Sequence, residues 1–339
     1  MSSVSVVIPC YNYGHFLEAA VASVLDDQQG VEVSVLIIDD ASHDDSAEVA
    51  LKVAASDTRV DVILHGTNKG NIATFNEGLL EWAEGDYCLL LSADDRLTPG
   101  ALRRARDLLD AKPDVAFAYG RALWVEDGAE DPTPRTKVRG WSVWPGEWWL
   151  RQIFRQGENP ITSPEVVMRT SVMKRVGAFD PALPYAADME LWLRLAANGE
   201  VGFIRGVDQA FYRLHTTNMR KGFNQLLDLR ERLAVYDTVL DRYGDQLGDA
   251  TGLSEAAGAK LGREALWTAG RASMRSDVDQ GHVDELLAFA VDCAPDVKRL
   301  PLHEALASHT RLGPRSMGWL FTEKVQWWLR RRAWTYRGY

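Results

Sequence analysis

The chain has 339 residues, a net charge of −10, 46% hydrophobic residues and 25% charged residues. A composition this close to that of ordinary globular proteins excludes a disordered or collagen-like chain, and the acidic charge disfavours nucleic acid as a partner. Since a domain usually has ~100–200 residues, the length allows about two domains.

Predicted strands and helices alternate over the N-terminal part of the chain. Runs of apolar and β-branched residues, typical of buried strands, occur at Val4–Ile8, Val33–Ile38, Val60–Leu64 and Tyr87–Leu91. Apolar residues at helical spacing predict helices over Phe16–Leu25, around Val49 and Val53, and over Ile72–Ala83. This alternation predicts an α/β fold with a mainly parallel sheet and helices on both faces.

The pattern changes after the fourth predicted strand. A helix is predicted over Ala101–Leu109, a strand over Val115–Tyr119, and a long loop over residues 126–147, which are rich in glycine, proline and charge. From about Phe223 onward the pattern is mostly helical. We therefore expect one domain over residues 1–219 and a helical C-terminal region over residues 220–339.

Polar residues follow three of the predicted strands. These residues are Tyr11 and Asn12, then Asp39 and Asp40, then Asp94 and Asp95. Because the carboxyl ends of parallel strands meet at one sheet edge, they predict a ligand site there. The first turn lacks the GxGxxG pattern of dinucleotide-binding domains, and no GxxxxGK[ST] loop is present. Phosphates, if bound, would then need other binding groups, and the carboxylates after the fourth strand suggest that a divalent metal binds them.

Several ordered motifs resemble those of family 2 glycosyltransferases. They are SVVIPCYN at residues 5–12, LIIDDAS at 36–42, NKG at 68–70, FNEGL at 75–79, LLSADD at 90–95 and DMELWLR at 188–194. The resemblance covers roughly residues 3–217 and depends on the order of the motifs more than on any one of them. It implies an inverting enzyme with the GT-A fold that uses a nucleotide-sugar donor.

The resemblance implies a nucleotide site at the ends of the first two strands. Pro9 and Tyr11 would flank the base, with the Tyr11 ring stacked on it, which is worth about 1–3 kcal/mol per base. Asp40 would accept a hydrogen bond from the base imide, with Asp39 close by. The matched motifs add Asn12, Asn68, Gly70 and Asn76 to the nucleotide-binding residues. The alternative is that Asp39 and Asp40 cap the following helix and that Tyr11 is an ordinary rim residue.

Asp94 and Asp95 occupy the position of the family's DxD motif. Ser92 stands where the first aspartate often lies, so this sequence departs from the pattern, but Asp94 retains the implied ligand for Mn²⁺ or Mg²⁺ on the donor diphosphate. By the same resemblance Asp95 and His215 are further candidate metal ligands. The alternatives are a helix cap for the aspartates and a structural role for the histidine.

Asp188 is the implied general base that deprotonates the acceptor hydroxyl. In the family a Glu-Asp pair lies at the start of a helix, but here Ala187 replaces the glutamate and only the aspartate remains. Glu190 is the second candidate base. The alternative is that Asp188 only caps the helix that follows.

The C-terminal tail, residues 311–339, has seven basic residues and one acid, a net charge of +6 that leaves −16 for the rest. Aromatic residues are interleaved with arginines in this tail, a pattern typical of a helix that contacts an anionic membrane. Docking on the body or on a second subunit is the alternative. The chain lacks a long apolar segment, a signal-peptide pattern and CxxC spacing. We expect a cytoplasmic protein whose tail contacts the inner membrane face.

The sequence therefore predicts a metal-dependent inverting glycosyltransferase. The expected donor is a nucleotide-diphosphate sugar, with a UDP-sugar as the first choice. The expected acceptor is a hydroxyl of a saccharide or of a lipid-linked acceptor in surface polysaccharide or glycolipid synthesis. A nucleotidyltransferase of similar fold is one alternative, but it would need a basic glycine-rich phosphate loop that is absent after the first strand. A catalytically silent sugar- or nucleotide-binding protein is the other, kept open by Ser92 and Ala187.

Overall fold

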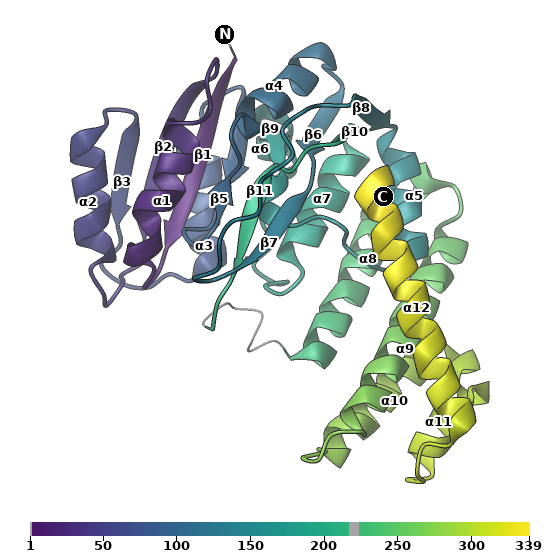
Figure 1. Cartoon of the computed structure of the whole chain (residues 1–339). Coiled ribbons are helices and arrows are strands. Elements are labelled where there is room, and N and C mark those ends of the chain that lie inside the picture. The colour runs from purple at the N-terminus through teal and green to yellow at the C-terminus, as the bar shows by residue number, and fades with distance from the viewer. Residues whose placement is uncertain (1, 217–223) are drawn as a thin grey trace. The chain divides into compact units, whose positions relative to one another are not determined.

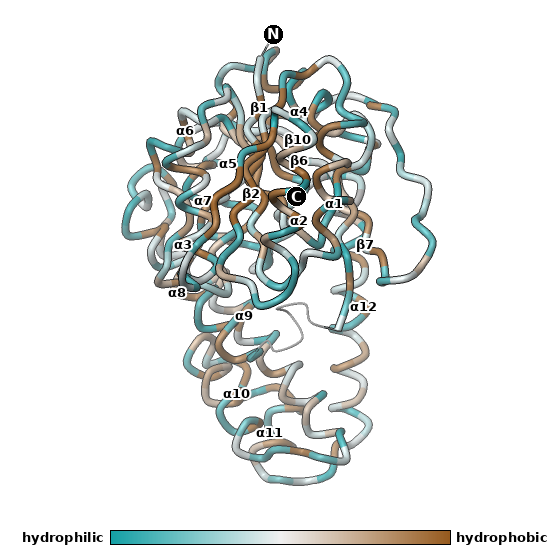
Figure 2. Tube along the Cα trace, turned by 90° about the vertical axis from the view of Figure 1, so that its left-hand side faces the viewer, coloured by the Kyte–Doolittle hydropathy of each residue, from teal (hydrophilic) through white to brown (hydrophobic). Residues whose placement is uncertain are grey.

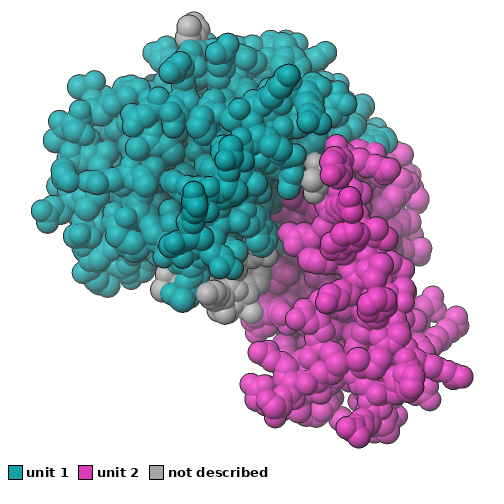
Figure 3. Space-filling view, viewed as in Figure 1, with its two compact units in different colours: residues 1–149, 161–221, 338 teal, residues 150–160, 222–337, 339 magenta. Residues whose placement is uncertain are grey.

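The computed structural model describes residues 2–216 and 224–339, and the chain forms two compact units (Figure 3). The sheet unit comprises residues 1–149, 161–221 and 338. The helical unit comprises residues 150–160, 222–337 and 339. The predicted domain boundary between residues 219 and 220 lies outside the described residues.

An eight-stranded sheet forms the centre of the sheet unit (Figure 1). Its strands are β1 (Ser3–Cys10), β2 (Glu32–Asp39), β3 (Val60–Leu64), β4 (Tyr87–Leu90), β6 (Val115–Tyr119), β8 (Trp141–Trp144), β9 (Val167–Arg169) and β10 (Glu200–Ile204). They lie in the order β3-β2-β1-β4-β9-β6-β10-β8, and only β9 and β8 run antiparallel to their neighbours. The predicted mainly parallel α/β sheet is confirmed. A second sheet has the order β5 (Arg96–Leu97), β11 (Ala210–Leu214) and β7 (Ala122–Glu126).

Helices cover both faces of the central sheet. They are α1 (Gly14–Leu25), α2 (Ser46–Ser56), α3 (Asn71–Asn76), α4 (Ala101–Ala111), α6 (Thr170–Val176) and α7 (Ala187–Ala197). Buried residues of α1 and α4 pack with Val6 and Ile37 on one face. On the other face Gly78 lies so close to the sheet that an added Cβ would be 2.4 Å from Val7 Cγ1. The strands β1 and β2 accordingly appear as hydrophobic traces in Figure 2, and the predicted two-sided packing is confirmed.

Two local features differ from the sequence-based expectation, and a helix for which no prediction was made follows β8. The predicted loop over residues 126–147 contains β8, which pairs antiparallel with β10 at the sheet edge. The predicted helix over residues 72–83 changes after α3 into a π-helical turn, η1 (Glu77–Trp82). The helix α5 (Gly146–Gln156) begins with Trp149 buried, its ring centroid 5.8 Å from that of Phe117.

The helical unit is built from α8 (Gln225–Leu247), α9 (Ala250–Ala272), α10 (Gln280–Cys293), α11 (Pro301–Ala307) and α12 (Pro314–Arg337), and it contains the short 3₁₀ turn η4 (Pro295–Arg299). A second 3₁₀ turn, η2 (Ser163–Glu165), belongs to the sheet unit. Side chains of Asn224, Asp249 and Asp279 cap the first three helices by accepting backbone hydrogen bonds. α9 and α10 pack closely, since a Cβ at Gly262 would be 2.8 Å from the Ala290 carbonyl oxygen. Within the described ranges, no helix combines the length and hydropathy needed to cross a membrane.

Candidate functional site

The three polar clusters that follow β1, β2 and β4 lie at one edge of the sheet. β1 is the middle strand, paired in parallel with β2 and with β4. Cys10 at the end of β1 is in register with Asp39 at the end of β2, and the Leu91 N–H after β4 donates to Val7 O at 2.9 Å. The structure therefore brings together the residues whose proximity the strand pattern predicted.

The turn after β1 presents Tyr11 to solvent. Asn12 has a left-handed backbone (φ 60°), which asparagine tolerates better than most residues. Its N–H donates to Ser42 Oγ at 2.9 Å, and its side-chain oxygen accepts from the His43 N–H at 2.7 Å. These bonds fix the turn, while the Tyr11 side chain is 42% exposed and Pro9 is half-buried. The Tyr11 ring is thus an accessible aromatic surface.

Asp39 is buried and has one oxygen without a hydrogen bond. Its Oδ2 accepts from the Ser42 N–H at 3.2 Å, whereas Oδ1 has no partner within the part of the chain that the structure describes. A buried acceptor left unsatisfied costs about 1–3 kcal/mol. A ligand that donates a hydrogen bond here would recover that cost. Asp39 does not cap α2, which begins at Ser46 with Asp45 as N-cap, so the capping alternative is wrong.

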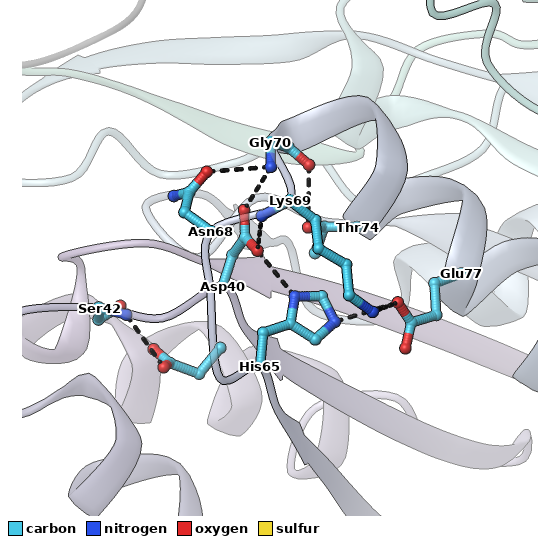
Figure 4. Close-up of polar contacts among 9 residues, drawn as sticks. Asp40, Ser42, His65, Asn68, Lys69, Gly70, Thr74 and Glu77 are labelled. Carbon is cyan, nitrogen blue, oxygen red and sulfur yellow. Dashed lines mark hydrogen bonds and ion pairs between the residues drawn. The ribbon is translucent and has the colours of Figure 1, made fainter.

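Asp40 is the centre of a hydrogen-bond network (Figure 4). Its carboxylate accepts from the N–H groups of Lys69 and Gly70 at 2.8 and 2.9 Å and faces His65 Nδ1 at 2.7 Å. Burial alone would raise the pKa of Asp40, but these hydrogen bonds outweigh it and lower the pKa. Asn68 joins the same turn, since its Oδ1 accepts from the Gly70 N–H at 3.0 Å. Asp40 therefore holds the 68–70 turn, and contact with a base stays a prediction.

His65 and Glu77 complete this network and were not predicted from the sequence. His65 Nε2 lies 3.0 Å from Glu77 Oε2, which also accepts from Lys69 Nζ at 2.7 Å. The bond from Lys69, followed by the His65 charge, lowers the pKa of Glu77. Only the imidazolium form of His65 can donate from both ring nitrogens to two carboxylates. A polar residue directly after β3 was the available signal, and it matches the pattern of the other strand ends.

Replacing His65 with phenylalanine tests the importance of the network. His65→Phe keeps an aromatic ring but leaves the buried carboxylate of Asp40 without one partner, so we expect the free energy of unfolding to fall by about 1–3 kcal/mol. Urea denaturation followed by circular dichroism measures this change. His43→Phe, at an exposed position nearby, is the matched control and should change it by less than about 0.5 kcal/mol. Equal effects of the two variants would contradict a structural network.

Asp94 and His215 face each other after β4 and β11. His215 Nε2 lies 2.9 Å from Asp94 Oδ2, and the imidazole packs edge-on against Tyr13 with ring centroids 5.2 Å apart. Arg213 fixes the neighbouring backbone: its N–H donates to Asp95 Oδ1 at 2.9 Å and its Nε donates to Asp94 O at 3.0 Å. Burial, and then the adjacent charge of Asp94, raise the pKa of Asp95 well above its usual range.

The pair formed by Asp94 and His215 fits a divalent cation that is shared with a ligand. Neighbouring ligands of an octahedral hard cation at ~2.1 Å lie about 3 Å apart, close to the 2.9 Å between Asp94 Oδ2 and His215 Nε2. Among residues 2–216 and 224–339, no three His, Cys, Asp or Glu side chains form a group that could hold a metal ion. Further ligands of the cation would therefore come from the diphosphate and water. Asp95 Oδ1 accepts the Arg213 N–H instead, and its metal role stays a prediction. Neither aspartate caps α4, whose N-cap is Gly100.

Asp188 lies in the first turn of α7 and is half-buried. Ser163 Oγ in η2 donates to Asp188 Oδ2 at 3.4 Å, and the Met189 N–H donates to Oδ1 at 2.6 Å. Since η2 packs against β4, β5 and β11, this contact connects Asp188 to the strands that carry Asp94 and His215. Ser163 was not predicted as a site residue.

Two other candidate residues are engaged in internal contacts. Glu190, the second candidate base, is fully buried and both of its oxygens pair with Arg194, at 2.5 and 2.6 Å, so it is not available to an acceptor and that alternative is wrong. The Asn76 amide makes two 2.8 Å hydrogen bonds with the backbone N–H and carbonyl of Phe179. Asn76 thus joins α3 to the segment that precedes α7, and its contact with a nucleotide stays a prediction.

Glu165, close to Ser163, predicts a pH dependence of stability. Burial raises the pKa of Glu165 to about 8, so the folded chain keeps it protonated where the unfolded chain does not. Between pH ~4.5 and ~8 the folded state therefore binds more protons at Glu165 than the unfolded state does. The free energy of unfolding falls as the pH rises through this range, by up to about 1.4 kcal/mol per pH unit. Glu165→Gln should make the decline shallower in urea titrations at several pH values. Glu84→Gln, at an exposed site, is the control; identical slopes in all three proteins would contradict the assignment.

Comparisons with known proteins identify the family of the chain. Residues 5–175, about half of the chain, match the model of glycosyl transferase family 2. The putative teichuronic acid biosynthesis glycosyltransferase TuaG of Bacillus subtilis is 31% identical over 126 residues, 37% of this chain and 49% of that protein. The first curated relatives are matched over 64%, 41% and 22% of their own lengths, so the chain spans less than two thirds of each.

Solved structures share the fold at low sequence identity. S. aureus TarS 1–349 in complex with UDP-GlcNAc has a TM-score of 0.63 and 16% identity, over 92% of this chain and 93% of that chain. The mannosyltransferase PcManGT from Pyrobaculum calidifontis, in complex with GDP-Man and Mn²⁺, has a TM-score of 0.58 and 14% identity, over 98% and 83%. These similarities confirm the predicted GT-A fold class with a helical C-terminal region.

Proposed function

The chain belongs to glycosyl transferase family 2 and is a glycosyltransferase, and from this premise we propose that it moves a sugar from a nucleotide-diphosphate donor to an acceptor hydroxyl with inversion. The main support is the convergence at one sheet edge of the exposed Tyr11 ring, the unsatisfied Asp39 oxygen and the Asp94–His215 pair. A nucleotide sugar presents a base that stacks, N–H and hydroxyl groups that donate, and a diphosphate that binds cations.

For the donor we propose a UDP-sugar. The solved neighbours were crystallised with UDP-GlcNAc in one case and GDP-Man in the other, so both nucleotides belong in the test. Pro9 and Tyr11 would flank the base, with Asn12 and the 68–70 turn around the nucleoside. Asp39 Oδ1 is the acceptor with room for a donated hydrogen bond, while Asp40 already faces three donors of the chain.

Asp188 is the proposed general base. It takes the proton of the acceptor hydroxyl while the acceptor oxygen forms a bond to the anomeric carbon. The bond from that carbon to the diphosphate oxygen breaks on the opposite side, so the configuration inverts and a nucleoside diphosphate leaves. The first turn of α7 stabilises the negative charge of Asp188, and the Ser163 hydroxyl orients its Oδ2.

Asp94 and His215 would hold Mn²⁺ or Mg²⁺ together with the donor diphosphate. When bound, the cation neutralises charge that develops on the leaving group. Arg213 keeps Asp94 in place through its Nε bond to the Asp94 carbonyl, and its guanidinium is anchored by Asp127 at 2.9 Å. This arrangement supports a metal site that is completed only by the donor.

The decisive experiment is a donor panel. The protein is incubated with Mn²⁺ and UDP- or GDP-linked sugars, and free nucleoside diphosphate is measured with and without saccharide acceptors. A glycosyltransferase releases the diphosphate and labels the acceptor with the sugar. A silent binding protein would bind a donor and release nothing. A nucleotidyltransferase would release pyrophosphate in a parallel incubation with a nucleoside triphosphate and a sugar phosphate. Either result would overturn the proposal.

We further propose that the acceptor belongs to a surface polysaccharide or glycolipid and that α12 contacts the anionic inner face of a membrane. The name of the relative TuaG supports the first part. For the second, large exposed apolar side chains lie on one face of α12: Met317, Phe321, Val325 and Trp328 follow one another at spacings of four, four and three residues, and Leu329 and Tyr336 continue this face four and eleven residues after Val325. Lys324 and Arg332 are exposed on the same helix, whose sole acid, Glu323, pairs with Arg263. Apolar and cationic groups together suit anionic lipid, whereas two copies would place like charges together.

Vesicle co-sedimentation tests the membrane contact. Phe321 is 69% and Trp328 52% exposed, and burying each ring in lipid contributes about 1.5–3 kcal/mol. The double variant Phe321→Ser/Trp328→Ser should therefore lose most binding to phosphatidylglycerol vesicles, and the wild type should bind phosphatidylcholine weakly. Leu51→Ser, 52% exposed on α2, is the control. Binding that is unchanged in the double variant, or absent in the wild type, rules out this surface.

A further inference from the structure

A pocket in the helical unit lies among the end of α5, α9 and α12. Its enclosed volume is about 70 Å³ and its mouth is open, so it can enclose one small charged group while a larger ligand would extend over the surrounding surface. Its walls contain two tryptophans, Trp267 and Trp327, and charged side chains of both signs. The transfer chemistry derived above uses none of these residues.

Three carboxylates at the pocket are each paired with an arginine. Arg330 lies 3.1 Å from Glu158, Arg263 pairs with Glu323, and Arg232 lies 2.7 Å from Glu264. The fixed negative charge of the pocket is therefore already compensated within the unit.

Lys260 is the cation that remains. It lines the pocket, and no hydrogen bond or ion pair joins it to any residue that the structure describes. Its stem packs on Gly157, where an added Cβ would be 2.4 Å from Lys260 Cβ. Burial, and then the charges of Arg330 and Arg263, lower the pKa of Lys260. The charges of Glu323 and Glu158 act in the opposite direction on this pKa, so the Lys260 ammonium itself, not a general positive field, is the group that would stabilise an anion here.

The two tryptophans add flat apolar surface next to this cation. Arg271 lies over the Trp267 ring and Arg331 over the Trp327 ring, 4.7 and 4.9 Å from the centroids. These contacts hold the rings in position on the two helices. An aromatic face suits the C–H surface of a sugar ring, and the paired carboxylates and guanidinium groups offer acceptors and donors to hydroxyls.

We propose that this pocket binds a saccharide that carries a negatively charged group, a carboxylate or a phosphate, with the anion at Lys260 and the ring on Trp267 or Trp327. A charged sugar uses every unassigned feature of the pocket, whereas a simple anion would leave the aromatic surfaces unused. The binding goes beyond the transfer reaction and does not depend on it, because all lining residues belong to the helical unit.

Calorimetric titration of the full chain without donor tests the proposal. The probes are a trigalacturonate, a glucose disaccharide phosphate, neutral maltotriose and inorganic phosphate. Both charged saccharides, or one of them, should bind at least about tenfold more tightly than maltotriose and inorganic phosphate, and the stronger of the two identifies the source of the anion. Lys260→Gln should weaken that binding about tenfold, while Lys298→Gln, exposed in the same unit, should not.

Variants of the aromatic wall separate a sugar site from an anion site. Trp327→Leu should weaken the charged saccharide and leave inorganic phosphate unaffected, and Trp327→Phe should restore part of the loss if the leucine variant is poorly folded by circular dichroism. No saccharide binding, equal binding of inorganic phosphate, or unchanged affinity in Lys260→Gln would each overturn the proposal. Because the titration contains no donor, its result does not depend on the transfer reaction. A chain that is inactive in the donor panel can still bind the charged saccharide, and an active chain can fail to bind it.

Discussion

The variant Asp188→Asn should retain donor binding and lose about 10²–10⁴-fold in the rate of sugar transfer. Asparagine has the shape of aspartate: its amide oxygen can accept from the Met189 N–H and its amide nitrogen can donate to the Ser163 hydroxyl, but it cannot take the acceptor proton. Loss of rate at constant affinity is the signature of an interaction made only in the transition state. Nucleoside diphosphate release gives the rate, and calorimetry with the donor gives the affinity.

The controls for this prediction separate chemistry from structure. Asp188→Glu keeps a base and should recover part of the rate, while Asp107→Asn, a half-exposed carboxylate on α4, should behave as wild type. Ser163→Ala removes one orienting bond and should cost less than the loss of the base itself. A rate that is unchanged in Asp188→Asn would exclude it as the base, and loss of both rate and donor affinity would indicate a structural role instead.

The sheet edge could be predicted because it follows from periodicity alone. Four short apolar runs with helices between them require parallel strands, and parallel strands place Tyr11, Asp39 and Asp94 at one edge whatever the details of packing. The family resemblance added roles to these positions but was not needed to bring them together. Short apolar runs that alternate with helical patterns therefore gave the most reliable predictions.

The contacts that decide which carboxylates are free could not be predicted in the same way. The i, i+4 spacing of Glu190 and Arg194 was a signal that the glutamate is paired, and it argues against a role as base. The partners of Asp40, in contrast, are His65 directly after β3 and the backbone of Lys69 and Gly70 in the next turn, which no local pattern connects to it. Likewise β8 is a short edge strand in a stretch rich in glycine and charge, and only pairing with β10 stabilises it.

The distinction between free and internally paired carboxylates also bears on which aspartate we propose as the acceptor for the base. From sequence, Asp40 was the acceptor for the base and Asp39 its neighbour. In the structure Asp40 is occupied by donors of the chain, and Asp39 has the buried oxygen that lacks one. Asp39→Asn should therefore weaken donor binding more selectively than Asp40→Asn, because the latter also releases the 68–70 turn.

Removal of the carboxylate at Asp94 should have the second large effect. Asp94 is one of the two side chains that we propose as ligands of the cation, so Asp94→Asn should lower the transfer rate by about 10²–10³-fold, and His215→Gln should lower metal affinity by about 10–100-fold. Chelation by EDTA should abolish transfer by the wild type, and added Mn²⁺ should restore it. The spectrum of free Mn²⁺ in electron paramagnetic resonance, recorded with the nucleoside diphosphate present, measures binding independently of activity.

The matched control for Asp94 is Asp107→Asn, which removes a half-exposed carboxylate on α4 that pairs with Arg106 and faces no proposed ligand. It should leave Mn²⁺ binding within about twofold of wild type, as expected for an exposed ion pair. Since Asp94 and His215 supply only two ligands, binding should need the diphosphate, and Mn²⁺ alone should bind weakly even to the wild type. Tight binding of Mn²⁺ without nucleotide, or unchanged binding in Asp94→Asn, would place the metal at other residues.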